Sequence, residues 1–478
     1  MGQVVLDTLE KNKLNKNIFR AYDIRGKIGT EWCLDNNFQE VFLIGQAIGL
    51  QLIERQSATI IIGRDGRLSS EAIADELING LLSVGCDVTN LGLTATPVVY
   101  HALTHLGIQN SIMITGSHSP PDHNGIKIVY ASKPLSSDQI TQVYQDIIDK
   151  LPASLSSTNK GKLTHYHQSI EDYQQAINDN IQLNRKLSIG IDSGNGATAL
   201  FSESLFKRLG CDVIPLFCTL DGTFPNHSPD PTSPKNLKSL IQLVKDNNLD
   251  IGIAFDGDGD RVIAVDNLGN ILWPDRILML LAQEVLRKNP GATVLYDVKC
   301  SFLVPKVVEK AGGKASMCIS GHSILKAEML AENALLGGEF SGHIILRDRW
   351  SNFDDGPYVA ARLLEILSNT TLSCHALFSQ FPVSYATPEC KIEFESPQQA
   401  NEALKQFIEV ADFGAENTSL IDGLRVDYDD GWGLIRSSNT SASLTFRFDA
   451  TSLQRMKEIL QKFRGIFKMT AFKHKLPY

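Results

Sequence analysis

Short aliphatic runs, apolar on both faces, recur along the chain and set its architecture. Three of them, residues 58–65, 187–192 and 292–297, end in an aspartate that a polar loop follows. A fourth run, residues 251–255, leads directly into further aspartates. Such runs are typical of strands buried between two layers of helices. In sheets of this kind ligands gather at the carboxyl ends of the strands, so we look for chemistry in the loops that follow.

Helical patterns separate these strands. Ser69 and Ser70 precede the helical stretch 71–82 and are suitable N-cap residues. The apolar stretch 41–53 is interrupted by glutamines and is too short to span a bilayer, which predicts a buried helix. Strands that alternate with helices indicate α/β domains with mixed, mostly parallel sheets. The recurrence predicts three related domains in tandem.

The C-terminal part of the chain follows a different pattern. Residues 391–394 and 444–448 alternate between apolar and polar positions as strands do, whereas 396–411 and 452–467 have the period of amphipathic helices. This predicts a smaller α+β domain after the three α/β domains. The expected domain limits are 1–162, 163–266, 267–382 and 383–478.

The composition narrows the class of protein. A chain of 478 residues with 43% hydrophobic and 21% charged residues is expected to be a soluble protein of several domains. Its net charge of −9 argues against nonspecific nucleic-acid binding. Its eight cysteines lack CxxC spacing, so we expect reduced thiols rather than a disulfide framework. Because Met1 begins no signal-peptide or myristoylation pattern, we expect a cytoplasmic protein without a membrane partner.

The densest cluster of candidate chemistry is Asp256-Gly-Asp258-Gly-Asp260, which follows the fourth apolar run. Three carboxylates so close together repel one another unless a cation neutralises them, and hard oxygen ligands suit Mg²⁺. An EF-hand requires Gly at its sixth position and Glu at its twelfth, but Arg261 and Asn267 stand there. A solvated acidic turn is the remaining alternative, although it does not explain the buried strand that leads in.

A second loop, residues 115–120, follows the apolar run 112–114 and contains Ser117 and His118. Gly116 permits a strained turn, so we expect Ser117 to be exposed at its tip. The dipeptide Asn124-Gly125 is a hairpin-turn signal that would return Lys127 to the loop. A Ser-His dipeptide alone is a weak signal, since it is usually polar loop sequence.

Two further loops combine groups that bind sugars and phosphates. Residues 338–343 contain Glu339 and Ser341, which can hydrogen-bond vicinal hydroxyls, although a glycine-rich turn explains the same residues. Residues 436–441 contain Arg436 among hydroxyl and amide side chains, a set that suits a phosphate dianion. Serine, threonine and asparagine also form ordinary turns, so the arginine carries this interpretation.

Taken in this order, the loops resemble the α-D-phosphohexomutase superfamily, and in particular its bacterial phosphomannomutase/phosphoglucomutase branch. The resemblance runs from residues 19–26 to residues 436–440. It implies an isomerase that interconverts the 1- and 6-phosphates of mannose or glucose through a phosphoserine and a hexose 1,6-bisphosphate. It also implies a single Mg²⁺, catalytic amounts of the bisphosphate as activator, and four domains around a central cleft. We expect a monomer, with a dimer as the alternative.

The resemblance also implies roles for individual residues. Ser117 matches the serine that holds the transferable phosphoryl group and, through that phosphate, contacts the metal. Asp256, Asp258 and Asp260 match the metal ligands. The residues that match those around the reacting phosphate are Tyr22, Arg25, His118, Lys127 and Arg261. The residues that match substrate-binding positions are Lys299, His322, Glu339, Ser341, His343, Arg436, Ser438, Asn439 and Thr440.

The sequence departs from the family pattern at two positions, and it leaves other functions open. Ser119 stands where the family usually has Asn, and Phe340 stands where this branch more often has Met. The glucosamine branch usually has Gln at the position of Phe340, so a phosphoglucosamine mutase is one alternative. Another is a metal-dependent sugar phosphatase with Asp258 as nucleophile, which would leave Ser117 without a role. A noncatalytic sugar-phosphate-binding protein is a third.

Overall fold

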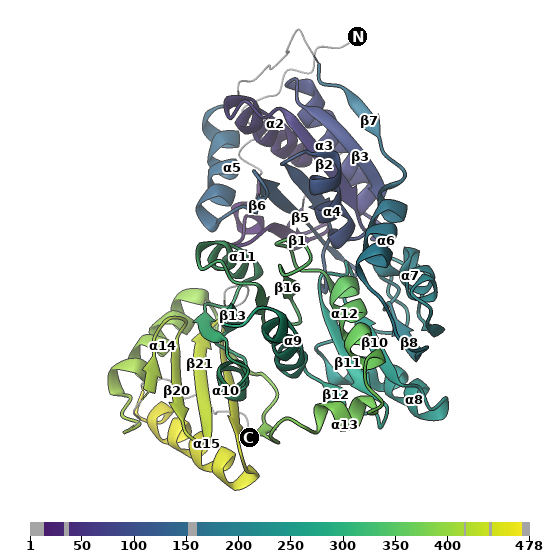
Figure 1. Cartoon of the computed structure of the whole chain (residues 1–478). Coiled ribbons are helices and arrows are strands. Elements are labelled where there is room, and N and C mark those ends of the chain that lie inside the picture. The colour runs from purple at the N-terminus through teal and green to yellow at the C-terminus, as the bar shows by residue number, and fades with distance from the viewer. Residues whose placement is uncertain (1–13, 33–37, 152–159, 415–416, 439–441, 471–478) are drawn as a thin grey trace. The chain divides into compact units, whose positions relative to one another are not determined.

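The structure, a computed structural model, describes residues 14–32, 38–151, 160–414, 417–438 and 442–470. The chain forms two compact units, each of which is described by itself. The first unit consists of Met1–Leu272 and Ser341–Cys374, and the second of Trp273–Phe340 and His375–Tyr478. The elements of both units can be followed in Figure 1 by their labels.

The first unit begins with a sheet of order β1-β5-β4-β2-β3-β7, to which β6 adds by pairing with β5. Its strands are β1 Ile24–Lys27, β2 Thr59–Arg64, β3 Asp87–Leu93, β4 Ser111–Ile114, β5 His123–Tyr130, β6 Lys133–Pro134 and β7 Leu163–His165. Its helices are η1 Lys16–Ile18, α2 Gln39–Glu54, α3 Ser70–Ser83, α4 Thr96–Leu106 and α5 Ser137–Asp149. The central strand β2 pairs in parallel with β3 and β4.

Strand β2 is buried on both faces, as its sequence predicts. Ile60 and Ile62 belong to the core beneath α2 and α3. Ile61 points to the opposite face and packs in a cluster with Tyr100 and Leu103 of α4. Because each face has its own helical cover, the interior positions 60–63 are apolar and buried, and polar residues occur only at the two ends of the strand.

A second sheet in the first unit has the order β12-β11-β10-β8-β9. Its strands are β8 Ser188–Asp192, β9 Asp212–Leu216, β10 Ile251–Phe255, β11 Val262–Asp266 and β12 Ile271–Leu272. Its helical segments are α6 Ser169–Asn180, η2 Ala197–Leu200, α7 Ser202–Arg208, η3 Pro234–Leu237 and α8 Lys238–Asp246. Strand β10 pairs in parallel with β8 and antiparallel with β11, so the acidic loop is the tight connection between β10 and β11. The strand β16 Ile344–Leu346 and the helix α12 Gly356–Ser368 complete this unit.

The second unit contains a parallel sheet in which β13 lies between β14 and β15. These strands are β13 Thr293–Asp297, β14 Lys314–Cys318 and β15 Leu336–Gly338. The helices nearby in sequence are α9 Pro274–Lys288, α10 Leu303–Lys310 and α11 His322–Ala331, and α13 Cys374–Phe378 begins at the unit boundary.

The C-terminal sheet of the second unit is antiparallel, with the order β17-β22-β21-β20-β19 and with β18 also paired to β22. Its elements are β17 Tyr385–Ala386, β18 Cys390–Glu393, α14 Pro397–Val410, β19 Asn417–Ser419, β20 Leu424–Tyr428, β21 Gly431–Ser437, β22 Ser443–Ala450 and α15 Leu453–Phe467. The two helices pack on the sheet through an aromatic core that includes Phe407, Phe448 and Phe463.

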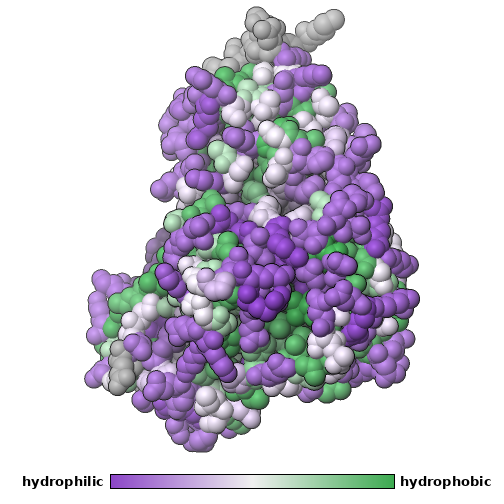
Figure 2. Space-filling view, viewed as in Figure 1, coloured by the Kyte–Doolittle hydropathy of each residue, from purple (hydrophilic) through white to green (hydrophobic). Residues whose placement is uncertain are grey.

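The expected fold class is confirmed: three α/β sheets precede an α+β domain. The buried helix expected at residues 41–53 is α2, and the seven cysteines of the described residues carry free thiols. Hydrophilic side chains cover much of the face shown in Figure 2. Among the described residues, no helix combines the length and the apolar character needed to cross a membrane.

Two local predictions were wrong. Ser69 precedes α3 but makes no side-chain cap, and the hydroxyl of Ser70 instead donates to Asp65 at 2.5 Å. Asn124 and Gly125 form no hairpin turn, because they lie inside β5, where Gly125 is paired with Arg25 of β1. A Cβ at residue 125 would lie 2.5 Å from the carbonyl oxygen of Ile24, so the glycine serves a close strand contact rather than a turn.

Each of the three α/β sheets places a buried aspartate at the end of a central strand. Asp65 accepts hydrogen bonds from Thr115 Oγ1 at 2.7 Å and from Ser70 Oγ at 2.5 Å. Asp192 accepts from the backbone N–H of Gly194 at 2.8 Å, with His227 Nε2 at 3.1 Å. Asp297 accepts from Ser320 Oγ, and at 3.1 Å from the backbone N–H of Phe340. These carboxylates therefore organise the loops beyond the strands.

Candidate active site

The acidic loop of the first unit gathers its carboxylates into one buried cluster. Asp256, Asp258 and Asp260 are each fully buried, and one oxygen of each lies within 4.8 Å of the others. The loop can turn so tightly because Gly259 adopts a φ of +82°. Asp256 Oδ1 accepts from the backbone N–H groups of Gly259 and Arg261 at 3.1 and 3.2 Å, which closes the turn.

The carboxylate cluster fits a divalent cation. Asp258 Oδ1 and Asp260 Oδ1 are buried without a hydrogen-bond partner within the described part of the chain. Burial, together with the charges of Asp260 and Asp258, raises the pKa of Asp256 well above its usual range. Buried carboxylate oxygens with unused lone pairs are the ligands that Mg²⁺ and similar hard ions prefer.

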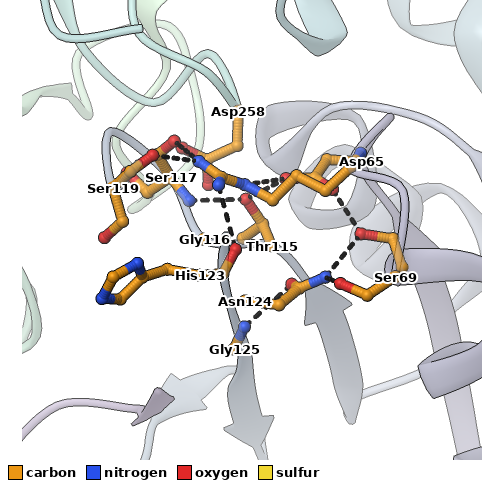
Figure 3. Close-up of polar contacts among 12 residues, drawn as sticks. Asp65, Ser69, Thr115, Gly116, Ser117, Ser119, His123, Asn124, Gly125 and Asp258 are labelled. Atoms are coloured by element: carbon orange, nitrogen blue, oxygen red, sulfur yellow. Dashed lines mark hydrogen bonds and ion pairs between the residues drawn. The ribbon is translucent and has the colours of Figure 1, made fainter. Parts of the chain in front are cut away.

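Ser117 lies against this cluster. Its Oγ donates to Asp256 Oδ2 at 2.9 Å and lies 3.3 Å from His118 Nδ1. Its backbone N–H donates to Thr115 Oγ1 at 2.8 Å (Figure 3). The candidate nucleophile and the candidate metal ligands therefore form a single site within the first unit.

The conformation of Ser117 differs from the exposed turn expected from the sequence. Only 1% of the residue is exposed, and Ser117 itself, not Gly116, has a left-handed φ of +48°. It is buried because the acidic loop closes over it: a Cβ at residue 257 would lie 2.4 Å from the carbonyl oxygen of Ser117. A glycine is needed at residue 257 for this close approach.

Two cationic side chains of the first sheet reach the site. Lys127 Nζ donates to Asp258 Oδ2 at 2.6 Å and to Asp260 Oδ2 at 2.5 Å. Burial would lower the pKa of Lys127, but the two carboxylates outweigh burial and raise it well above its ordinary value. Arg25 Nη1 donates to the carbonyl oxygen of Gly116 and to Ser119 Oγ, both at 3.1 Å, so the serine at position 119 retains a polar contact in the loop.

Arg261 and two histidines also lie near the cluster. Arg261 Nε lies 3.1 Å from His343 Nε2 and 3.8 Å from Asp256 Oδ2. His343 Nε2 lies 3.4 Å from Asp260 Oδ1, and its Nδ1 lies 3.1 Å from Ser341 Oγ. Burial, with the positive charge of Arg261, holds the pKa of His118 well below its usual range.

The second unit contains a separate polar group at the end of β13. Lys299 Nζ lies 3.7 Å from Glu389 and 3.8 Å from Asp297. The side chain of Glu339 accepts a hydrogen bond at 2.5 Å from the backbone N–H of Gly321, the residue before His322. Lys299, Gly321 and Glu339 follow β13, β14 and β15, so they lie at the carboxyl ends of three neighbouring parallel strands.

Arg436 of the second unit uses only part of its hydrogen-bonding capacity within the described residues. Its Nε donates to Asp422 Oδ2 at 2.9 Å, while its buried Nη2 has no hydrogen-bond partner in the described ranges. Ser438 follows at the end of β21. Asn439 and Thr440 lie outside the described residues.

Residues that were not predicted from the sequence also hold these groups in place. Thr96, the first residue of α4, donates from Oγ1 to Asp258 Oδ2 at 2.5 Å and from its backbone N–H to the carbonyl oxygen of Asp258 at 3.0 Å. Nothing in the local sequence marks Thr96. Arg67 was missed as well, although it follows the strand-ending Asp65 by two residues, the kind of position at which the other candidates were found.

A buried serine hydroxyl beside a carboxylate cluster that fits a divalent cation, with arginine and lysine side chains around it, is typical of enzymes that transfer phosphoryl groups. Comparisons with known proteins identify the family. Four family models of phosphoglucomutase/phosphomannomutase match in order. They describe α/β/α domain I at residues 16–152, domain II at 166–269, domain III at 273–385 and the C-terminal domain at 389–466.

Individual relatives agree with the family models. A "Phosphomannomutase/phosphoglucomutase" of Pseudomonas putida is 45% identical over 94% of this chain and 95% of that protein. A "Phosphoglucomutase" of Neisseria meningitidis is 41% identical over 95% of this chain and 97% of that protein. The crystal structure of a phosphoglucomutase/phosphomannomutase family protein from Burkholderia thailandensis superposes with a TM-score of 0.89, at 40% identity, over 97% of this chain and 99% of that one. The chain belongs to the phosphoglucomutase/phosphomannomutase family and is an enzyme, a phosphohexomutase.

Proposed function

We propose that this phosphohexomutase interconverts the 1- and 6-phosphates of glucose and mannose through a phosphate carried on Ser117. The observation that carries the proposal is the 2.9 Å contact between Ser117 Oγ and Asp256, inside a cluster of three buried carboxylates. The names of the relatives support both sugars, since one is a phosphomannomutase/phosphoglucomutase and another a phosphoglucomutase.

Asp256, Asp258 and Asp260 would hold Mg²⁺, with the phosphate on Ser117 as a further ligand. When bound there, Mg²⁺ would withdraw negative charge from the phosphoryl oxygens, which is the main electrostatic assistance available to such a transfer. Arg25 contacts the Ser117 loop and Arg261 lies beside Asp256, so both place positive charge around the phosphoryl group.

In the first half-reaction a free sugar hydroxyl attacks the phosphorus. The new O–P bond forms as the bond from Ser117 Oγ to phosphorus breaks, the leaving Oγ takes up a proton to become the serine hydroxyl again, and the product is a hexose 1,6-bisphosphate. A base accepts the hydroxyl proton, and Lys127 and His118 are the two candidates. The two carboxylates favour the charged form of Lys127, which has no lone pair to accept a proton, whereas burial favours the neutral form of His118 and makes it a weaker base.

The bisphosphate must then present its other phosphate to Ser117, so the substrate groups must accept two orientations. Free hexose 1,6-bisphosphate would act as activator by phosphorylating Ser117. In the first unit we assign substrate binding to Tyr22, Ser341 and His343. In the second unit we assign it to Lys299, His322, Glu339, Arg436, Ser438, Asn439 and Thr440.

Intact-mass measurement of the purified protein tests the proposal. We expect a single phosphate on the wild-type protein, its loss in Ser117→Ala, and its retention in Ser119→Ala, the matched control in the same loop. Ser117→Ala should lose at least about 10³-fold in kcat, because it removes the group that accepts the phosphoryl. A wild-type protein that is active without ever carrying this phosphate would contradict the scheme.

Steady-state kinetics decide between the sugars. We expect kcat/KM for glucose 1-phosphate and mannose 1-phosphate to exceed kcat/KM for glucosamine 1-phosphate, measured with trace bisphosphate and Mg²⁺. The reverse order would identify a phosphoglucosamine mutase, and release of inorganic phosphate without isomerisation would identify a phosphatase.

A further inference from the structure

Arg67, between β2 and α3, has a guanidinium side chain with no solvent exposure. A buried arginine is costly unless every donor finds an acceptor. Its surroundings are supplied by the Ser117 loop on one side and by Asp65 on the other. Figure 3 shows Ser117 and Ser119 on the left of this group of residues and Asp65 on the right.

The guanidinium is saturated with hydrogen bonds, most of them to backbone carbonyl oxygens of one loop. Nη2 donates to the carbonyls of Ser117 and Ser119, both at 2.7 Å. Nη1 donates to the carbonyls of Pro120 and His123 at 2.6 and 3.0 Å. Nε donates to Asp65 Oδ2 at 3.2 Å. An arginine has five N–H donors, and here each of them has an acceptor, which no other side chain could match.

Asp65 and Arg67 together hold both backbone polar groups of Ser117, its N–H and its carbonyl. Asp65 accepts from Thr115 Oγ1 at 2.7 Å, and Thr115 Oγ1 accepts from the backbone N–H of Ser117 at 2.8 Å. The carbonyl of Ser117 is held by Arg67. Asp65 and Arg67 thereby hold Ser117 in its left-handed conformation, which a residue other than glycine rarely adopts without such support.

The guanidinium is also enclosed by neighbouring chain segments. Its Cζ lies 4.9 Å from the ring centroid of Phe224, in the loop after β9. A Cβ at Gly116 would lie 2.6 Å from Arg67 Cζ, so the loop backbone contacts the guanidinium directly. These two contacts restrict where the guanidinium can lie.

We propose that Arg67 is a positioning residue for phosphoryl transfer: it fixes the Ser117 loop so that Oγ points at the carboxylate cluster. All five of its N–H donors are taken by protein acceptors, which leaves none for the sugar or the phosphoryl group, so we expect its contribution to fall on the chemical step and not on substrate binding. This inference rests on the proposed role of Ser117.

The test compares Arg67→Lys with the matched control Arg64→Lys. Lysine keeps the positive charge beside Asp65 but has three donors on one atom, which cannot serve carbonyls spread along the loop. For Arg67→Lys we expect kcat to fall about 100-fold while KM changes less than about threefold. Arg64 is partly exposed and paired with the exposed Glu71, so Arg64→Lys should match wild type in both.

A second readout separates positioning from a general loss of folding. The rate at which glucose 1,6-bisphosphate phosphorylates Ser117 in a single turnover, followed by intact mass, should fall in Arg67→Lys by the same factor as kcat. A merely structural role would lower the folded fraction and the midpoint of thermal unfolding, but the folded molecules would react at the wild-type rate.

Gly116→Ala keeps the proposal testable if Arg67→Lys does not fold, because its new Cβ displaces the guanidinium without changing any charge. It should show the same fall in kcat with little change in KM. Wild-type kcat in either folded variant would overturn the positioning role and leave the Ser117 scheme intact. A wild-type protein that never carries phosphate on Ser117 would overturn both.

Discussion

Buried arginines hold two loops of this enzyme. In one loop the arginine comes from the same domain, and in the other the arginines come from a different domain. The Ser117 loop is held by Arg67 of the same domain, since domain I of the family spans both residues. The loop at residues 298–300, which carries Lys299, belongs to domain III, but the arginines that hold it come from the C-terminal domain.

Arg425 and Arg447 hold the Lys299 loop through its carbonyls. Arg425 Nη1 donates to the carbonyls of Val298 and Cys300 at 2.7 and 2.9 Å, and its guanidinium carbon lies 4.1 Å from the ring centroid of Trp432. Arg447 donates to the carbonyl of Lys299 and, at 3.3 Å, to Asp275.

The two loops differ in which domain supplies the arginines that fix their conformation. The nucleophile must keep one geometry for every turnover, and the arginine that holds its loop, Arg67, belongs to the same domain. Lys299, which we assign to substrate binding, takes its position from a neighbouring domain. A substitution that loosens the Ser117 loop should therefore lower kcat, and one that loosens the Lys299 loop should raise KM.

The largest expected effect is at the carboxylate cluster of the first region. Asp258→Asn removes one charge from the candidate metal site and should lower kcat at least about 10³-fold, or about 4 kcal/mol in the barrier. Activity should recover in part at high Mg²⁺. Kinetics across a range of Mg²⁺ concentrations, with calorimetric titration of the ion, measure both effects.

Asp246→Asn, at the C-terminal end of α8, is the control for Asp258→Asn and should match wild type. The phosphate on Ser117 should persist in Asp258→Asn when the protein is loaded with bisphosphate. Complete loss of covalent phosphate would instead support Asp258 as the nucleophile of a phosphatase.

Arg425→Lys should give an intermediate effect of the opposite kind. Lysine leaves a carbonyl of the Lys299 loop without its donor, and a net loss of about 1.4 kcal/mol corresponds to a tenfold change. We expect KM for the hexose 1-phosphate to rise about tenfold and kcat to change less than threefold. The exposed Arg287→Lys on α9 is the control. If Arg425→Lys and Arg67→Lys changed kcat and KM in the same way, the proposed difference between the Ser117 loop and the Lys299 loop would be wrong.

The smallest effect concerns the acid stability of the first unit. Burial, with the charge of His105, lowers the pKa of His101 to about 4. The unfolded chain, with an ordinary pKa of 6.5, binds more protons than the folded chain between these values. The stability contributed by neutral His101 is therefore present above pH 6.5 and is lost as the pH falls toward 4.

A loss of about 2 kcal/mol corresponds to a fall of about 5 °C in the midpoint of thermal unfolding between pH 7 and pH 4.5. His101→Phe retains a ring beside Trp350 and should shrink this shift, whereas His165→Phe, at an exposed position, should not. Equal shifts in both variants would show that His101 is not responsible.

The strands and the chemical residues were predictable from sequence for physical reasons. A strand covered on both faces must be aliphatic throughout, so residues 251–255 reveal β10 directly. A metal site needs several carboxylates close together, and Asp256, Asp258 and Asp260 supply them within one turn. The family resemblance then placed Ser117 beside them, and the 2.9 Å contact agrees with that placement.

The residues that hold the loops in place, such as Arg67, were not predictable in the same way. The acceptors of Arg67 are carbonyls, which every residue possesses, and they lie about fifty residues away in sequence. The turn predicted at Asn124-Gly125 does not form, because these residues pair with β1 as part of β5. In that strand Asn124 donates to the hydroxyls of Ser69 and Ser70, another contact without a local signature.

The buried aspartate at the end of a central strand occurs in all three α/β domains. Its hydrogen-bond donors differ in each: hydroxyls and an arginine around Asp65, a backbone N–H and a histidine around Asp192, and a hydroxyl and a backbone N–H around Asp297. A carboxylate accepts from any donor, so it constrains the sequence of its loop very little. For protein engineering, each aspartate sets one requirement on a replacement loop: a loop that returns no donor to the strand end would leave a buried carboxylate unpaired, which lowers stability.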